Sequence, residues 1–551
     1  MKRFVSLVLS ALCVFGVTAF APTDIEASAA SGYEPGDIAA VYIETENTVN
    51  PDYYVGCTIR IVDKEGGEYA ELYDSAASIK IRGNSTSSGA KKPYNFKFSS
   101  KTNVFGMGKA KKWCLLANCY EKTLIRNEMV FDFARQTVLR YTPDSVYVDV
   151  YFNGVLSGNY ILCEAVEDGS SRVDIDTDAN EFLLERDVRT DEGTYYFNTP
   201  YYGIRFGLNA PETPTSGQIE WLNGFLYDAE MALHYRDFNS IDDYFDIPSM
   251  VDFYIILEYF KQVDVSVGST RFYIKDGKIY GGPVWDFDLT MGNCLSSYYQ
   301  AYNNVGGSGK SCESIYCAVD WYSKLLDVPE FLSRVKERYL ELQNIILNLY
   351  ADTLSGTNYI DRTIAENSAS FGRNYSEAGW KIGVTYSDLE RIPENTYEGN
   401  VEYLRTWLRE RNDWLLGHWG ITARAYPSPS ASSGLTVSGG FIYGLGADRT
   451  PSEVSAMFGS NAVITCGKYV GTGSTVSVGG ADYAFVVIGD VNGNGSIDAG
   501  DYIMTKRAFV GTYSLTPIML AAADCDGSGS VSAADYLMIK RHFLGSYNLY
   551  N

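Results

Sequence analysis

Hydrophobic and polar positions alternate in several stretches of the first half of the chain, which is the pattern of half-buried strands. Residues 145–166 alternate on both sides of Asn153–Gly154, and an Asn-Gly pair between two such runs predicts a tight β-hairpin. Residues 329–354 instead repeat their apolar positions at helical spacing, and residues 403–420 also have a helical pattern. Residues 30–424 are therefore predicted to form one mixed α+β domain.

One short apolar run carries two acidic residues. Residues 281–293, GGPVWDFDLTMGN, have the composition of a buried strand that contains Asp286 and Asp288. In an extended chain residues i and i+2 face the same way, so Trp285 and Phe287 are expected on one side and both carboxylates on the other. The pattern alone allows either a solvated face or a functional site.

Residues 78–98 predict a second hairpin, with a Gly/Ser-rich turn between its strands. Lys80, Arg82, Asn95 and Lys97 share its polar face. Basic groups beneath a turn rich in backbone N–H donors can bind phosphate. The simpler interpretation of this segment alone is a lysine-rich edge hairpin that avoids aggregation. The apolar positions, expected in the core, are Ile79, Ile81, Phe96 and Phe98.

The first residues predict a secretory signal peptide, residues 1–29. They begin with Lys2 and Arg3, continue with an apolar stretch and end in small residues, with cleavage expected after Ala21 or Ala29. No later stretch has the roughly 20 uncharged apolar residues that span a bilayer. A secreted, extracellular protein without a membrane span is therefore expected.

A second change of composition follows the large domain. Residues 425–434 are rich in proline and serine and are predicted to be a linker. Residues 435–488 are rich in glycine, valine and threonine, which predicts a small β module. The sequence of this module indicates no chemistry.

Composition argues against several classes of function. A formal net charge of −23 repels phosphate backbones, so nucleic acid is not an expected partner, whereas divalent cations are. Nine cysteines remain without Cys13, an odd and sparse set for which one or two disulfides at most are expected. A zinc site has little support, because C-x-x-C is absent and the only histidines are His234, His418 and His542.

The strongest sequence signal is a repeat with a 34-residue period near the C-terminus. Residues 490–511 and 524–545 each begin with a twelve-residue loop of EF-hand type, with oxygen-bearing residues at positions 1, 3, 5, 9 and 12 and glycine at position 6. A hard cation such as Ca²⁺ takes six to eight oxygen ligands, which such a loop can supply. The predicted ligands of the first site are Asp490, Asn492, Asn494, the Ser496 carbonyl, Asp498 and Asp501. Those of the second are Asp524, Asp526, Ser528, the Ser530 carbonyl, Ser532 and Asp535.

Position 12 is aspartate in both loops, and each loop is followed by one helix without a matching helix in front. Over residues 489–551 this combination resembles type I dockerin domains. The resemblance implies an all-α fold of paired loop–helix units, called F-hands, that binds two Ca²⁺ ions. It also implies docking onto a cohesin module of a cellulosome scaffold, in the setting of polysaccharide degradation. By analogy, the cohesin contacts are expected at Ala499, Gly500, Lys506, Arg507, Ala533, Ala534, Lys540 and Arg541.

An ordered set of motifs in the large domain carries a second resemblance. The motifs are RGN at 82–84, LLAN at 115–118, RNE at 126–128, G-x-Y-x-L-x-E at 158–164, the lone Asp187 and WDFD at 285–288. Over roughly residues 37–420 this order resembles the CotH family, named for a spore-coat protein and regarded as atypical, secreted protein kinases.

The CotH resemblance implies a reduced kinase-like fold that binds ATP with Mg²⁺ or Mn²⁺ and transfers phosphate to a protein. Matching positions give Asp264 the role of catalytic base and give Asp286 and Asp288 the role of metal ligands. Carboxylates that project together suit a hard metal ion, which agrees with phosphoryl transfer. The expected phosphate contacts are Arg82 and Lys97, and the residues expected near the nucleotide are Asn127 and Glu164.

Departures from the family pattern leave other functions open. Val263 precedes Asp264 where many relatives have asparagine, and Thr270–Arg271 occupies the place of a later asparagine. One alternative is a catalytically inactive structural or adhesion module in which the acids hold a structural Ca²⁺. Another is a glycan-active enzyme, since acids on one face of a strand lie about 7 Å apart, a separation that inverting glycosidases use.

Overall fold

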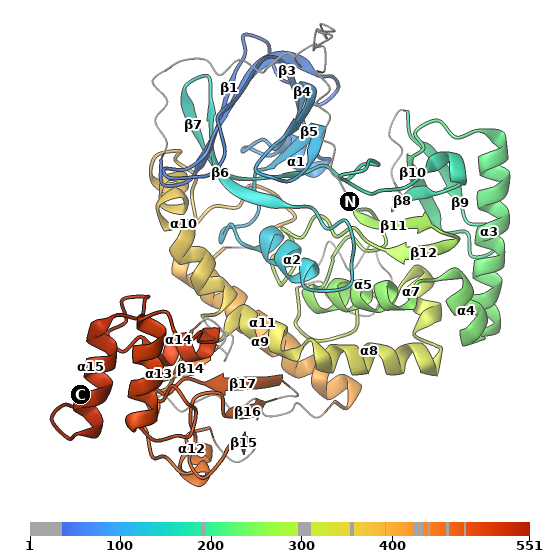
Figure 1. The fold of residues 1–551 in the computed structure, drawn as a ribbon. Helices are drawn as coiled ribbons and strands as arrows, with labels where there is room; N and C mark the ends of the chain where they lie inside the picture. Colours follow the sequence, from blue (N-terminus) through green and yellow to red (C-terminus); the bar gives the residue numbers. More distant parts are fainter. Residues whose placement is uncertain are drawn as a thin grey trace, which may run out of the picture.

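The structure is a computed structural model in which a large domain is followed by a small β module and a C-terminal helical unit (Figure 1). The expected signal peptide and most of the expected linker lie outside the described residues. Among the described residues, no helix is both long enough and apolar enough to cross a membrane. The described ranges are 36–188, 193–295, 310–352, 357–391, 393–421, 433–438, 441–458, 462–478 and 481–550.

The N-terminal part of the large domain is a closed barrel in the order β1-β2-β3-β4-β5-β7-β6. Its neighbouring strands pair antiparallel, except that β1 and β6 pair parallel and close the barrel. The strands are β1 (Ala39–Glu44), β2 (Val55–Val62), β3 (Leu72–Ile81), β4 (Tyr94–Asn103), β5 (Lys109–Leu116), β6 (Ser145–Phe152) and β7 (Val155–Glu164).

Both predicted hairpins are part of this barrel. Asn153 and Gly154 join β6 to β7 with φ angles of 48° and 77°, as a tight hairpin turn requires. β3 and β4 are the second hairpin, and their predicted core residues are all buried. The edge-hairpin interpretation is wrong, because β3 pairs with β2 and β4 pairs with β5. The basic face of this hairpin therefore needs another explanation.

A five-stranded sheet with the order β12-β11-β8-β10-β9 forms the second part of the large domain. Helices pack around this sheet on the side away from the barrel (Figure 1). The strands are β8 (Phe182–Arg186), β9 (Tyr195–Asn198), β10 (Arg205–Ala210), β11 (Thr270–Lys275) and β12 (Lys278–Gly281). The helices are α3 (Ser216–Tyr235), α4 (Phe238–Tyr244), α5 (Ile247–Phe260) and α7 (Asp320–Leu325).

α5 is the central helix of the domain, and all but one of its residues are buried. It starts where the Asp246 side chain accepts the N–H of Ser249, and it ends at Lys261, whose φ is 57°. It contacts α2 (Arg126–Arg135), α8 (Pro329–Glu341) and α11 (Tyr397–Trp419). α9 (Gln343–Tyr350) packs against α11, and α10 (Tyr359–Ser376) lies against β6 and β7 of the barrel. The single helix predicted over 329–354 is interrupted at Leu342, and residues 353–354 lie outside the described part.

A buried ion pair joins α11 to α5. Arg411 and Glu258 are both completely buried, and the guanidinium bonds the Glu258 carboxylate and its backbone carbonyl. Its second amino group donates 2.8 Å hydrogen bonds to the carbonyls of Cys312 and Ser314. The pair therefore fixes α11 and the 312–314 segment against the central helix.

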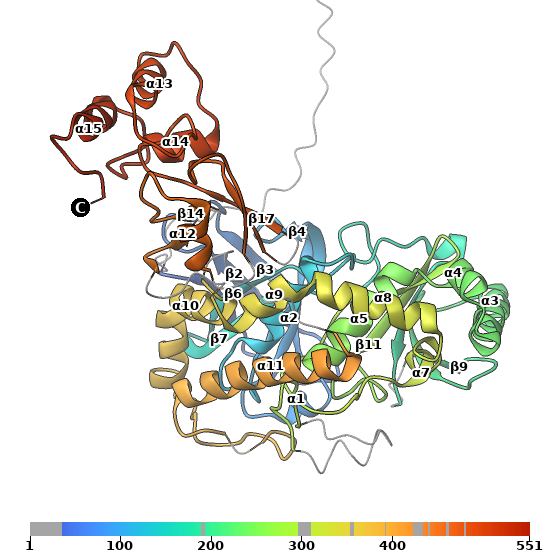
Figure 2. The ribbon, with the colours of Figure 1, turned by 90° about the horizontal axis from the view of Figure 1, so that it is seen from below.

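The β module is a sheet with the order β13-β14-β17-β16-β15, joined to α9 of the large domain by a 3.0 Å hydrogen bond from Asn344 to Tyr483. Figures 1 and 2 both show it, with the C-terminal helices beyond, at the end of the molecule away from α3 and α4. Its elements are β13 (Thr436–Ser438), β14 (Phe441–Tyr443), α12 (Pro451–Ala456), β15 (Val463–Thr465), β16 (Thr475–Val478) and β17 (Ala481–Phe485).

The C-terminal unit has the predicted loop–helix pairs, with α13 (Ala499–Phe509) after the first loop and α15 (Ala533–Phe543) after the second. The expectation that no helix precedes either loop is wrong for the second one. A short helix, α14 (Pro517–Ala523), ends directly before Asp524. Its N-terminal proline is the sequence signal that could have indicated it.

Replacement of Arg411 by alanine is expected to lower the free energy of unfolding of the large domain by about 3–5 kcal/mol. The change leaves the Glu258 carboxylate buried without its cation. Chemical denaturation followed by tryptophan fluorescence measures the effect. Arg409→Ala, at an exposed position of the same helix, is the matched control, and equal stability of the two variants would contradict the role of the ion pair.

Candidate active site and calcium loops

A cavity of about 380 Å³ lies between the β3–β4 turn of the barrel and the second sheet. The turn lines it with residues 82–86, which lead into the short helix α1 (Ser85–Ser88). The other walls come from β8, the start of β11, the segment after α5 and residues 285–289. The charged residues of the lining are Arg82, Glu185, Asp264, Arg271, Asp286 and Asp288.

Residues 282–289 are not a strand, so the predicted extended conformation of WDFD is wrong. β12 ends at Gly281, and Asp286 has a φ of 66°, in the left-handed region. Trp285 and Phe287 are buried, but Trp285 lines the cavity together with both acids, so the expected separation of the apolar and acidic faces is wrong for Trp285. Both carboxylates nevertheless line the cavity, because the local bend at Asp286 replaces the alternation of a strand.

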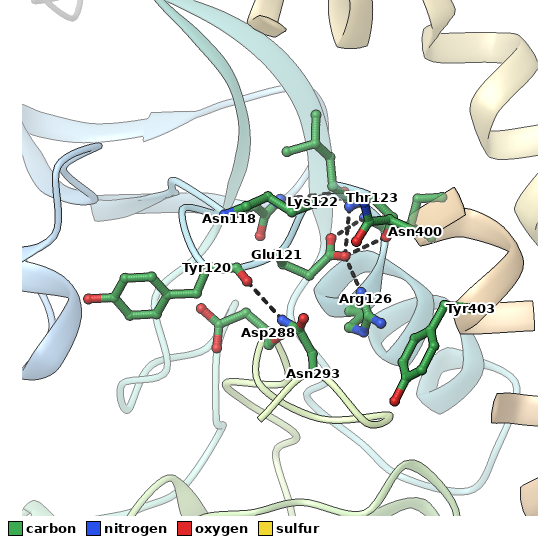
Figure 3. A network of polar contacts seen from close by, with 12 residues as sticks. Asn118, Tyr120, Glu121, Lys122, Thr123, Arg126, Asp288, Asn293, Asn400 and Tyr403 are labelled. Carbon is green, nitrogen blue, oxygen red and sulfur yellow. Dashed lines mark hydrogen bonds and ion pairs between the residues drawn. The ribbon is translucent and has the colours of Figure 1, made fainter. Parts of the chain in front are cut away.

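Amide side chains hold this irregular segment in place. Asn127 Oδ1 accepts the N–H of Phe287 at 2.7 Å, and Gln262 Nε2 donates to the carbonyls of Trp285 and Asp286 at 3.0 and 2.8 Å. Asn293 Nδ2 donates to the carbonyls of Asp288 and Tyr120, each at 2.8 Å. Figure 3 shows Asn293 between Asp288 and the Tyr120 backbone.

The segment behind Asp288 is organised by the buried carboxylate of Glu121. This carboxylate accepts the N–H groups of Thr123 and Ile125 at 2.8 Å and forms an ion pair with Arg126 (Figure 3). Arg126, the first residue of α2, therefore has a structural role, because its ion pair with Glu121 holds the loop that precedes the helix. The RNE motif contributes support to the cavity through Arg126 and Asn127.

Asp264 reaches the cavity from the turn that follows α5. Its backbone carbonyl accepts the N–H groups of Val267 and Gly268 at 2.7 and 2.9 Å, and its own N–H donates to Gln262 Oε1 at 3.2 Å. Ser269, in the same turn, donates its hydroxyl to Asp286 Oδ2 at 3.0 Å. The turn thus positions Asp264 and supports Asp286 at the same time.

The carboxylates of Asp264, Asp286 and Asp288 concentrate negative charge in the cavity and form its acidic floor. Burial raises the pKa of the Asp288 carboxyl well above its ordinary value, and the charges of Asp286 and Asp264 raise it further. The described residues do not bring three of these carboxylates within 4.8 Å of one another. One or two carboxylates together with phosphate oxygens are the usual ligands of Mg²⁺. The floor therefore fits an ion bound jointly with phosphate, and not an ion held in a cage of protein ligands.

Two guanidinium groups line the same cavity as these carboxylates. Arg82 lies 4.8 Å and Arg271 lies 5.5 Å from the centroid of the Trp285 ring. Arg271 also bonds Glu185 at 2.8 Å. Nε of Arg82, and Nε and Nη1 of Arg271, are buried and have no hydrogen-bond partner among the described residues. Cations opposite carboxylates are what a complex of a metal ion with phosphate requires.

The two C-terminal loops have matching geometry. Asp501 accepts the N–H groups of Val491 and Asn492, and Asp535 likewise accepts those of Cys525 and Asp526. In the second loop, carboxylate oxygens of Asp524, Asp526 and Asp535 lie within 4.8 Å of one another. A set of oxygen ligands in this arrangement fits Ca²⁺.

Two family models match the sequence. The model of the CotH kinase protein family covers residues 79–415, more than half of the chain. The chain belongs to the CotH family. The model of the dockerin type I domain covers residues 488–544. No curated protein matches the sequence. Both sequence resemblances are confirmed, and the chain is a CotH protein of cellulosome type, whose dockerin implies Ca²⁺ binding and a cohesin partner.

Two residues that the CotH resemblance placed at the nucleotide lie elsewhere. Lys97 Nζ sits 4.4 Å from the centroid of the Tyr54 ring, outside the cavity lining. Glu164 forms an ion pair with Arg172 and lines a separate cavity, and burial raises its pKa to about 7. Asn127 adjoins the site, but both ends of its amide bond protein groups.

The structure adds Arg271 to the lining of the CotH cavity and shows that Gln262 and Asn293 hold the backbone of residues 285–288 behind it. Arg271 appeared in the sequence only as a departure from the family pattern, and Gln262 and Asn293 were not considered. Gln262 lies two residues before Asp264, and Asn293 lies five residues after Asp288. Polar residues so close to the predicted catalytic acids are the signal that could have found them.

The expected cohesin contacts of the dockerin lie on accessible helix faces. Lys506 and Arg507 on α13 and Lys540 and Arg541 on α15 are exposed, and Ala499 and Ala534 are exposed as well. Gly500 and Ala533 are partly exposed. Each half also stacks an arginine near a tyrosine, Arg507 on Tyr513 at 5.4 Å and Arg541 on Tyr547 at 5.2 Å.

In chelator, Asp288→Asn is expected to melt a few degrees above the wild type at pH 8. The pKa of the Asp288 carboxyl is higher in the folded protein than in the unfolded chain. The wild type therefore keeps its full stability below about pH 4, near the ordinary pKa of aspartate, and loses stability as the pH rises toward the pKa of the folded state. The variant lacks this loss, so the difference should shrink toward pH 4. Circular dichroism melts from pH 4 to 8 measure it.

Asp276→Asn, at an exposed position with positive φ, serves as the control for the melts and should follow the wild type at every pH. A lower melting temperature of Asp288→Asn at pH 8 would show that the buried charge does not destabilise the metal-free protein.

Proposed function

We propose that the CotH domain is a protein kinase that transfers phosphate from ATP in this cavity, with Mg²⁺ or Mn²⁺ as the metal. The observation that carries the proposal is that Asp264, Asp286 and Asp288 line one cavity together with Arg82 and Arg271. Phosphoryl transfer depends mainly on positioning and on neutralising phosphate charge, and this arrangement offers groups for both.

The residues divide into three roles. Asp264 acts as the catalytic base that accepts the proton of the acceptor hydroxyl. Asp286 and Asp288 hold the divalent ion, which neutralises phosphate charge when bound. Arg82 and Arg271 bind phosphate oxygens. Because Asp264 lies in the turn that also carries Ser269, the base and the metal ligand Asp286 keep a fixed relation.

Arg271 offers an answer to the missing family asparagine. Thr270 and Arg271 stand where many relatives have the later asparagine, and the Arg271 guanidinium lines the cavity. An arginine supplies charged N–H donors to phosphate where asparagine supplies an amide. Arg271 can therefore supply a phosphate contact in place of the asparagine. An inactive structural or adhesion module is the alternative, and a phosphorylation assay distinguishes the two.

The glycan-active alternative has lost its geometric basis. It depended on two acids on one face of a strand, and residues 282–289 are not a strand. We therefore retain phosphoryl transfer as the proposed chemistry of the large domain.

The C-terminal unit gives this activity a location. We propose that residues 1–29 direct export and that the dockerin binds two Ca²⁺ ions and docks onto a scaffold cohesin through the exposed faces of α13 and α15. The kinase would then act outside the cell on a protein held in the same assembly.

Incubated with labelled ATP and Mn²⁺, the protein is expected to label itself or a casein-like acceptor. Asp264→Asn should lower the rate about 10³-fold or more while ATP binding persists, since the loss of a positioned base affects the chemical step. Asp286→Ala should weaken binding of the Mn²⁺–ATP complex. Radiolabel incorporation and calorimetry measure the two effects.

Asp276→Asn is the control for these assays, because its side chain is exposed and outside the cavity. If the wild type neither binds the Mn²⁺–ATP complex nor transfers label, the kinase proposal is wrong and the inactive module is supported. If it binds the complex without transfer, the domain is a nucleotide-binding pseudokinase.

Removal of Ca²⁺ with chelator is expected to abolish binding to cohesin, because the carboxylates of each loop then repel one another and the F-hands lose their order. Surface plasmon resonance with a panel of immobilised cohesins, with and without Ca²⁺, measures this. Asp524→Ala together with Asp490→Ala should reproduce the effect of chelator. Unchanged binding in chelator would contradict the docking mechanism.

A further inference from the structure

We infer that the β module, residues 435–488, packs directly against the first calcium loop and makes the Ca²⁺ affinities of the two sites unequal. The Thr472 N–H donates to Asp490 Oδ2, the carboxylate at position 1 of the loop, at 2.9 Å. The Asp448 carboxylate accepts the hydroxyl of Ser496 at position 7. The Asp448 N–H also donates to the Gly495 carbonyl at 2.7 Å. The module thus contacts three positions of one calcium loop.

The module and this loop pack so closely that three glycines at the contact have no room for a side chain. A Cβ atom on Gly471 would lie 2.5 Å from Asp490 Oδ2, and one on Gly495 would lie 2.6 Å from Tyr469 Cβ. A Cβ atom on Gly493 would overlap the Thr472 carbonyl oxygen. Glycines on both sides of the contact therefore allow the two backbones to meet directly.

The second loop provides an internal comparison, because it has glycine at the same two positions of the repeat. Gly527 and Gly529 correspond to Gly493 and Gly495, and a Cβ atom on either would meet nothing within 4 Å. Asp490 is completely buried, whereas Asp524 at the matching position is partly exposed. The contact with the module is thus specific to the first loop and not a general property of the repeat.

This contact organises the ligands of the first site before an ion arrives. Asp490 accepts N–H groups from Thr472, Gly493 and Gly495, so its carboxylate is held by the module as well as by its own loop. A ligand set that is already ordered loses less conformational entropy on binding. The first loop should therefore bind Ca²⁺ more tightly than the second, and Ca²⁺ bound there should stabilise the module.

The inference rests on Ca²⁺ binding by the dockerin, and the experiment separates the two. Calorimetric titration of the full chain with Ca²⁺ in an Asp524→Ala background reports the first loop, and an Asp490→Ala background reports the second. Gly471→Ala is expected to weaken Ca²⁺ binding at the first loop at least about tenfold and to leave the second unchanged. No heat in either background would refute calcium binding itself, whereas normal binding that Gly471→Ala does not alter would refute only the role of the module.

Two further measurements keep the inference testable if Gly471→Ala disturbs the fold. Gly467→Ala, an exposed glycine of the same module with nothing within 4 Å of its Cβ position, is the matched control and should bind as the wild type does. Asp448→Gly removes the carboxylate at a position with φ 60°, which glycine adopts without strain, and is expected to weaken the first site about threefold to tenfold. Unchanged Ca²⁺ affinity of the first loop in Asp448→Gly would contradict the role of the module.

Hydrogen exchange provides a readout outside the dockerin. Addition of Ca²⁺ to the full chain is expected to slow exchange of the Thr472 amide about tenfold, because this N–H donates to Asp490 Oδ2 of the first loop. The Val470 and Gly471 amides donate to Arg449 and Ser474 within the module and serve as internal references. In the Asp490→Ala variant this protection should disappear. Exchange of the Thr472 amide that does not respond to Ca²⁺ would overturn the inference.

Discussion

Three hydrogen-bonding amide side chains fix the backbone of residues 285–288, and the arrangement of the cavity depends on them. Buried backbone groups outside regular structure need partners, and Asn127, Gln262 and Asn293 supply them from three separate segments. They allow Asp286 to adopt positive φ without leaving its neighbours unbonded. Because Asn127 belongs to α2 and Gln262 follows α5, the acidic floor forms only when α2 and α5 have packed together.

Local patterns predicted the elements whose conformation is decided locally. The Asn153–Gly154 turn, the buried faces of β3 and β4 and the paired calcium loops all depend on residues close in sequence. The conformation of WDFD does not. An apolar run can be a buried strand or a buried irregular segment, and periodicity does not distinguish them. The contact that decides it joins Asn127 to Phe287, 160 residues apart in the chain.

The predicted cavity residues also divide into those that the sequence placed correctly and one whose position depends on distant contacts. Arg82, Asp264, Asp286 and Asp288 were predicted because the family motifs fix their order, and all of them line one cavity. Lys97 was predicted from its strand face and from the CotH resemblance, and it lies outside the cavity lining. A face gives the direction of a side chain but not its neighbour, which here is the ring of Tyr54. The positions of such neighbours depend on how the barrel closes, and single-strand patterns do not contain that information.

The two ends of the protein use carboxylates in opposite ways. In the dockerin, backbone N–H groups surround Asp501 and Asp535, and the carboxylates of the second loop converge closely enough to form a cage for one ion. In the CotH cavity no three of the described carboxylates converge within 4.8 Å, and Arg82 and Arg271 line the same cavity. A converging set favours Ca²⁺, which takes six to eight oxygens, whereas a spread set leaves coordination positions for phosphate around a smaller ion. Geometry thus separates the two ion requirements within one acidic chain, so the calcium of the dockerin need not compete for the metal position of the cavity.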